Sequence, residues 1–325
     1  MPGFTTHYIF GMKAYNDMPF TPLKHTIAKY RWLYQLGLQG PDMFFYNIPI
    51  LRHRDYRNVG SYMHEHKVNA FFECCLRRIG TIRSRQQQEE AISYLAGFIN
   101  HYIADSICHP YVYGRIGYPV DAPTSMHHGM HAHLENELDA ILLWKYKKKK
   151  PSEFNQTATI CLNGQEIQFI SHFLASCINE TYYPITYRNN FQVTPAMVHR
   201  SIWALRFGCR TLSDKNGKKK FGIAQVESIF VNHPVASAKM VTDSVTDYRS
   251  SCNLNHEAWS NPWDPTRIST ASFVDLFHET LDKCSRVYAL LNSAVTDNMP
   301  LDKQDLSPLL AELGNESYHS GLPVE

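Results

Sequence analysis

The sequence predicts an all-α fold, and three observations support this prediction. Apolar residues recur at helical spacing along most of the chain, segments with strand-like alternation are scarce, and no internal repeat interrupts the pattern. The 325 residues are 44% hydrophobic and 19% charged, which is typical of a folded globular protein. We therefore expect a single large helical domain, in which residues 151–325 continue the helical core formed by residues 1–150.

Helices are expected wherever the apolar pattern has a period near 3.6 residues. These segments are 22–36, 67–79, 89–109, 126–146, 195–212 and 272–295, and the run that ends at residue 180 also looks helical. The segment 89–109 is apolar on most sides, so we expect it at the centre of the domain.

Two segments depart from this helical pattern. Short alternating runs flank Asn163-Gly164, and this combination predicts a small hairpin near 157–169. The residues after about Leu313 carry no strong periodicity and lie at a chain end, so we expect them to be loosely packed.

Charge and cysteine usage restrict the class of protein. The formal net charge is +2, which gives no reason to expect a stable nucleic-acid partner. Two basic runs, at 147–150 and 218–220, fit solvated loop ends or a docking surface for an anionic membrane or substrate. The chain has no uncharged apolar run of about 18 residues and no signal-peptide pattern, so we expect a cytoplasmic protein. Its eight cysteines lack paired spacing, which favours reduced thiols.

The first chemical motif lies on the predicted central helix. His101, Asp105 and His109 follow one another at i, i+4 and i+8, so each is rotated by only about 40° from the last and all three share one stripe. A buried carboxylate without partners is very costly. The stripe therefore fits a metal site, a hydrogen-bonded core network or a polar face toward water.

A second helix carries a similar motif. His131 and Glu135 lie four residues apart, and Asp139 continues their stripe. A helical His-x3-Glu places one imidazole and one carboxylate on a single ion. An exposed ion-pair face is the alternative for this motif alone, but two such stripes on nearby helices favour a pair of metal-ligand helices.

Together these motifs resemble the zinc-dependent phospholipase C family, in particular its shorter, single-domain bacterial members. The resemblance extends over essentially the whole chain, and its specificity comes from the ordered set of motifs. That set is Thr6-His7-Tyr-Ile-Phe-Gly, Gly40-Pro41-Asp42-Met-Phe-Phe-Tyr, Met63-His64, the two helical stripes, and the tryptophan-rich segment 254–263.

The resemblance implies a helical fold of the trinuclear-zinc type and a ligand set for two to three Zn²⁺ ions. One ion would be held by Asp42, His64, His101 and Asp105, a second by His109, His131 and Glu135, and a third near His7 with Asp105 as a bridge. It places the metal-binding core in residues 1–150. Large toxins of this family carry a carboxy-terminal β-sandwich that docks on membranes, whereas residues 151–325 here read as further helices.

Four residues are expected around this centre. Asp139 is expected to orient His131 or Glu135 or to form a helix-surface pair, and His128 is expected at the pocket rim. Asn255 and His256 lie in a loop rich in Trp and Pro, which would either roof the pocket or cap the helical core.

The implied activity is hydrolysis of a phosphodiester by a water that zinc activates, with Asp42 or Asp105 holding the water or taking its proton. The expected substrate is a phospholipid or a smaller phosphodiester, with peripheral contact to a membrane. Hydrolysis of nucleotides or single-stranded nucleic acid on the same site is the alternative within enzymes. A non-catalytic helical protein with structural zinc is the alternative from another class, because a structural site is closed by four protein ligands.

Overall fold

Helices account for most of the residues that the computed structural model describes, namely 3–46, 59–182, 192–212, 214–230, 237, 240–243, 245 and 247–325. The amino-terminal half contains α1 (Phe4–Asp17), α2 (Pro22–Lys29), α3 (Arg31–Gly37), the 3-10 helix η1 (Gly40–Tyr46), α4 (Val59–Glu65), α5 (Val68–Thr81), α6 (Arg85–Arg115) and α7 (Ser125–Lys147). The other half contains the 3-10 helices η3 (Pro151–Glu153) and η4 (Gln156–Thr159), then α8 (Gly164–Thr181), α10 (Pro195–Leu212), α11 (Lys218–Phe230), α12 (Tyr248–Ser251), β1 (Trp259–Asn261), β2 (Asp264–Ser269), α13 (Phe273–Thr296) and α14 (Ser307–Leu313).

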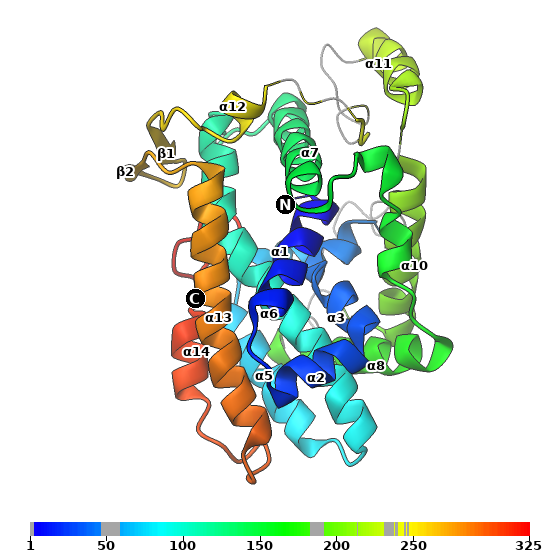
Figure 1. The fold of residues 1–325 in the computed structure, drawn as a ribbon, viewed down its shortest axis with the longest axis vertical. Helices are drawn as coiled ribbons and strands as arrows, with labels where there is room; N and C mark the ends of the chain where they lie inside the picture. Colours follow the sequence, from blue (N-terminus) through cyan, green and yellow to red (C-terminus); the bar gives the residue numbers. More distant parts are fainter. Residues whose placement is uncertain are drawn as a thin grey trace.

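The long helix α6 forms the centre of the molecule (Figure 1). Residues on all of its sides are buried, and helices α1, α2, α3, α5, α7, α8 and α13 pack against it. The central helix predicted at 89–109 is therefore confirmed, and it is longer than predicted at both ends. The all-α prediction is also confirmed, because β1 and β2 form only a small antiparallel hairpin.

A close contact between α3 and α6 sets the position of η1. A Cβ atom on Gly37 would lie 2.1 Å from the carbonyl oxygen of Tyr94, and one on Gly97 would lie 2.1 Å from that of Tyr34. Only glycine permits two backbones to approach so closely. The chain that leaves α3 consequently enters η1 directly beside α6.

Two local predictions were wrong. The helix expected over 22–36 is divided at Tyr30, whose carbonyl accepts a hydrogen bond from the Ser93 hydroxyl of α6 (3.0 Å). The hairpin expected near 157–169 is η4 followed by the start of α8. Asn163 does not form a hairpin turn because it caps α8: its side chain accepts from the Glu166 amide, and the Glu166 carboxylate accepts from the Asn163 amide.

Helix α1 lies outside the segments predicted as helical. Its first turn has no side-chain cap of its own. Instead, the Asp139 carboxylate of α7 accepts hydrogen bonds from the backbone amides of Thr5 (3.1 Å) and Thr6 (2.7 Å). The start signal of α1 is therefore more than 130 residues away, where a local pattern does not record it.

The segment after α14 is packed, and the expectation of a loose end was wrong. Tyr318 is only 1% exposed, and its amide donates to the His64 carbonyl (2.9 Å). The Asn261 side chain of β1 donates to the carbonyl of Ser320 (2.7 Å). Backbone hydrogen bonds to distant segments, rather than an apolar pattern, hold this segment in place.

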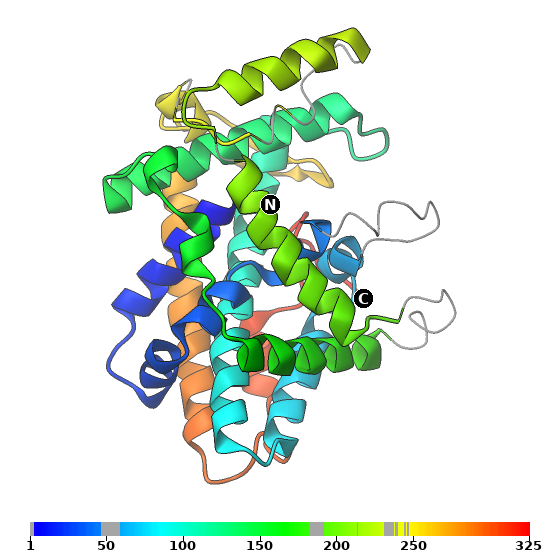
Figure 2. The same ribbon diagram turned by 90° about the vertical axis from the view of Figure 1, so that its right-hand side faces the viewer.

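Helix α10 forms an outer wall of the molecule and packs against α8 and η1 (Figure 2). None of the helices described above is both long enough and apolar enough to cross a membrane. All eight cysteines are free thiols, and most of them are buried.

Candidate metal centre

The first cluster gathers two imidazoles and two carboxylates from η1, α4 and α6. One ligand atom each from Asp42, His64, His101 and Asp105 lies within 4.8 Å of all the others, and all four residues are buried. His64 Nε2 is 3.2 Å from Asp42 Oδ1, and His101 Nε2 is 3.1 Å from Asp105 Oδ2. These four side chains could hold one metal ion.

The second cluster lies where α6 meets α7. His109, His131 and Glu135 also place one ligand atom each within 4.8 Å of one another. His131 Nε2 is 2.6 Å from Glu135 Oε1, and His109 Nε2 is 3.6 Å from the same oxygen. Three protein ligands are the number found in catalytic zinc sites, which keep a further position for water or substrate.

Asp105 links these clusters to His7 of α1. The His7 Nε2 atom is 3.2 Å from Asp105 Oδ1, and the His7 ring stacks on His101 with the ring centres 3.9 Å apart. The His109 Nδ1 atom is 3.7 Å from the same Asp105 oxygen. Because His64 and His101 lie on its other oxygen, Asp105 is surrounded by four imidazoles.

Backbone carbonyls orient three of the histidines. In each of them Nδ1–H donates to a main-chain oxygen, which turns Nε2 toward the cluster and fixes the tautomer. The pairs are His64 with Gly60 (2.6 Å), His101 with Leu38 (3.1 Å) and His109 with Tyr318 (2.6 Å).

The inward-facing atoms of this centre are buried and have no hydrogen-bond partner among the residues that the structure describes. They include Nε2 of His64, His101 and His109, Oδ1 of Asp42, and both carboxylate oxygens of Asp105. Buried polar atoms without partners are costly and rare, so a ligand that satisfies several at once is expected here. A mixture of imidazole and carboxylate suits zinc better than magnesium, which prefers oxygen ligands only. The residues therefore fit zinc.

The charges of the centre reinforce one another. Burial opposes ionisation of Asp105, but the neighbouring imidazoles of His109, His101 and His7 outweigh it and hold the pKa of Asp105 well below its usual range. Burial likewise lowers the pKa of His64, yet the neighbouring carboxylates of Asp105 and Asp42 outweigh burial and raise that pKa to about 9. The carboxylates thus create a strongly cation-attracting centre in a buried environment.

Gly40 is required by the geometry of the first cluster. Its φ angle is +46°, a region that favours glycine, and a Cβ atom there would lie 2.3 Å from Cδ2 of His101. The motif Gly40-Pro41-Asp42 therefore brings the backbone against one ligand while it presents the next.

Asp139 and His128 both lie on α7, but Asp139 is buried and His128 is exposed. Asp139 was expected to orient His131 or Glu135 or to pair on the helix surface. Its carboxylate instead caps α1, and Asp139 also lines a cavity between α7, η1 and α10. It thereby supports the helix that carries His7. His128 is exposed at the start of α7, with its ring 6.1 Å from that of Tyr118.

Asn255 and His256, which were expected either to roof the pocket or to cap the helical core, belong to neither cluster. Both are exposed, and His256 Nδ1 donates to the carbonyl of Thr270 (3.0 Å), beside the start of α13. The same loop instead covers the helical core through its tryptophans. Trp263 packs edge-to-face on Tyr113, whose ring centre is in turn 4.5 Å from that of His131.

His319 and Tyr318 belong to the centre but were not predicted from the sequence. The His319 ring stacks on His64 with ring centres 4.9 Å apart, and its Nδ1 is 3.3 Å from the Tyr113 hydroxyl. Tyr318 supplies the carbonyl that orients His109. The available signal was an aromatic–histidine pair in a polar tail, which is weak without knowledge of the fold.

Comparison with protein-family models gave a match. The family model for zinc dependent phospholipase C matches residues 6–186, which include His7 and every candidate ligand of both clusters. No curated protein and no solved structure matches the chain. Because the family match spans more than half of the 325 residues, the chain belongs to the zinc-dependent phospholipase C family.

Proposed function

We propose that this protein is a zinc-dependent phosphodiester hydrolase. Asp42, His64, His101 and Asp105 bind one zinc ion, His109, His131 and Glu135 bind a second, and His7 with Asp105 binds a third. The observation that carries the proposal is the set of buried imidazole and carboxylate atoms that converge without hydrogen-bond partners. Membership of a hydrolase family supports the same activity.

The carboxylates have different roles in this proposal. Zinc, when bound, supplies Lewis acidity that activates water and stabilises charge on a phosphate ester. Asp105 balances the positive charge of the centre, because it lies among four imidazoles. Asp42, the other carboxylate of the first cluster, would hold the attacking water or take its proton.

The second cluster favours catalysis over a structural metal. A structural zinc site is closed by four protein ligands, whereas His109, His131 and Glu135 provide three. Glu135 also lines a cavity, so this cluster lies next to space that a substrate can enter.

Zinc content and hydrolysis test the proposal together. We expect two to three zinc equivalents per chain, and dipicolinate should remove both the zinc and the activity. The purified protein should hydrolyse p-nitrophenylphosphorylcholine and short-chain phosphatidylcholine, releasing diacylglycerol from the latter. Less than one zinc equivalent after purification in excess zinc would refute the metal centre.

The substrate panel should include single-stranded DNA and RNA. Cleavage of nucleic acid without turnover of phosphocholine esters would assign the centre to a nuclease. Inactivity on every phosphodiester, with zinc fully loaded, would favour structural zinc.

A further inference from the structure

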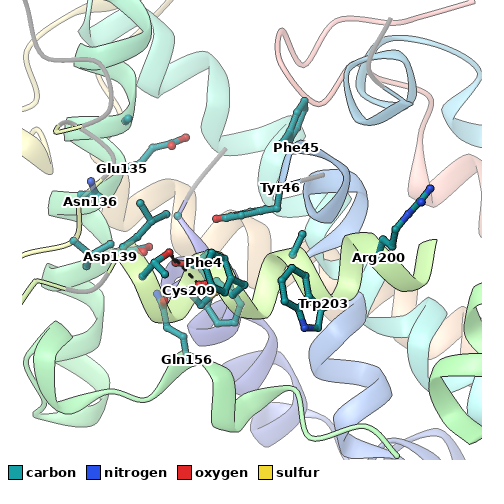
Figure 3. A pocket seen from close by; sticks show the side chains of 18 residues that line it. Phe4, Phe45, Tyr46, Glu135, Asn136, Asp139, Gln156, Arg200, Trp203 and Cys209 are labelled. Atoms are coloured by element: carbon teal, nitrogen blue, oxygen red, sulfur yellow. Dashed lines mark hydrogen bonds between the residues drawn. The ribbon is translucent and has the colours of Figure 1, made fainter. Parts of the chain in front are cut away.

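A cavity of about 650 Å³ opens beside the second cluster, between α7, η1 and α10 (Figure 3). This volume is typical of sites that bind small molecules. Glu135 lines one end of the cavity, so the cavity borders the second cluster at that side chain. Helix α10 forms its outer wall and lies beyond the matched residues 6–186.

Helix α10 turns an open apolar stripe toward this cavity. The lining residues recur at helical spacing, so they form one face of the helix: Arg200, Trp203, Ala204, Phe207, Gly208 and Thr211. Trp203 is 63% exposed and Phe207 is 50% exposed, and their rings stack 5.3 Å apart. A second face of α10, with Ile202 and Leu205, is buried in the core.

The exposed stripe is therefore not needed for packing of the fold. Leaving two large aromatic side chains in water at the edge of a cavity forgoes the free energy of burying them. A ligand that covers them would recover it.

The opposite wall of the cavity is also aromatic. Phe4 and Tyr46 lie across from Trp203 (Figure 3). A Cβ atom on Gly208 would be 2.4 Å from the Tyr46 ring, so that ring rests directly on the backbone of α10. Ala204, with its small side chain, lines the cavity between Trp203 and Phe207.

The charged side chains that line this cavity lie at its two ends. Glu135 and Asp139 lie at one end and Arg200 at the other (Figure 3). The Asp139 carboxylate already accepts from two backbone amides, and the Gln156 side chain donates to the Thr5 hydroxyl (3.1 Å). The middle of the cavity thus selects an apolar occupant.

We infer that this cavity binds one alkyl chain of an amphiphilic phosphodiester whose phosphate lies at the metal centre. The inference rests on the proposed function, because the metal centre fixes the position of the phosphate. In this inference, the exposed stripe of α10 contacts the alkyl chain.

Binding of alkylphosphonates to the zinc-loaded protein tests this inference without hydrolysis, since the carbon–phosphorus bond is not a phosphoester. Hexyl-, octyl- and decylphosphonate, each below its critical micelle concentration, would be titrated by calorimetry. The Kd should fall roughly fourfold for each methylene that leaves water. A Kd that is independent of chain length would overturn the inference.

Two variants locate the chain. Ala204→Phe places a large ring in the cavity and should weaken decylphosphonate binding at least tenfold more than methylphosphonate binding. Trp203→Ala removes one wall at an exposed position and should flatten the chain-length dependence. Ala289→Phe, on an exposed face of α13, is the matched control and should leave the Kd of both ligands unchanged.

The outcomes separate the inference from the proposed function. Equal losses of both ligands in Ala204→Phe, or equal behaviour of Ala204→Phe and Ala289→Phe, would overturn chain binding in this cavity. Chain-length-dependent binding in a protein that hydrolyses no phosphodiester would refute the proposed function and support the chain site.

Discussion

Asp139 connects the stability of the fold to the metal centre, and its removal gives a quantitative test. The carboxylate is 2% exposed and accepts from the amides of Thr5 and Thr6. In Asp139→Ala both buried amides lose their acceptor, at about 1–3 kcal/mol each. At about pH 4, where the folded carboxyl is not yet ionised, we therefore expect the free energy of unfolding to fall by about 2–6 kcal/mol.

The same variant should affect metal binding selectively. His7 lies in the first turns of α1, so loosening of that end should reduce zinc content by about one equivalent while both clusters remain loaded. The assays are chemical denaturation of the chelated protein and elemental analysis of the zinc-loaded protein. Asp17→Ala at the other end of α1 is the control, since its pair with Lys13 is half exposed and worth under about 0.5 kcal/mol. A loss below 1 kcal/mol, or equal effects of the two variants, would refute the capping role.

The pH dependence of Asp139 gives the sign of its electrostatic contribution. Burial raises its pKa from 3.8 to about 6, so the folded state favours the protonated carboxyl. The stability from this group is present below about pH 4 and is lost as the pH rises through 6. Two pKa units correspond to about 3 kcal/mol. Asp139→Asn lacks this titration, so chelated Asp139→Asn should gain about that much relative to wild type between pH 4 and 7. If the free energies of unfolding of Asp139→Asn and wild type, measured by chemical denaturation, changed in parallel with pH, this prediction would be contradicted.

Two further predictions concern the first cluster. Asp105→Asn should abolish hydrolysis and lose zinc, because Asp105 contacts four imidazoles. Glu137→Gln, whose buried carboxylate accepts from Ser251 outside both clusters, should keep activity within a few-fold, and equal effects in zinc and rate assays would show that the assigned stripe is wrong. Gly40→Ala should cost about 1–3 kcal/mol through its positive φ alone and should release zinc by displacing His101. Gly222→Ala, with open space around it in α11, should be neutral or stabilising in thermal unfolding, and a similar loss in both variants would argue against the close contact at Gly40.

The parts of the fold and site that the sequence predicts are those with a local pattern. The stripes of His101 and His131 could be read directly, because residues four apart on a helix share a face. Asp42 and His64 lie in short helices without such a pattern, and only the resemblance to a family drew attention to them. The cap of α1 went unpredicted because it joins residues more than 130 positions apart.

The remaining features depend on main-chain groups that any residue carries. Three candidate ligands are oriented by main-chain carbonyls from different segments: Leu38 directly after α3, Gly60 in the first turn of α4, and Tyr318 after α14. A carbonyl acceptor imposes no requirement on the side chain at its position, so no motif records it. His319 reaches the centre for the same reason, because the chain around it is held by backbone hydrogen bonds such as that from Tyr318 to His64. The sequence therefore predicts which side chains are candidate ligands. Their orientation depends on the path of the backbone, so only the folded structure shows it.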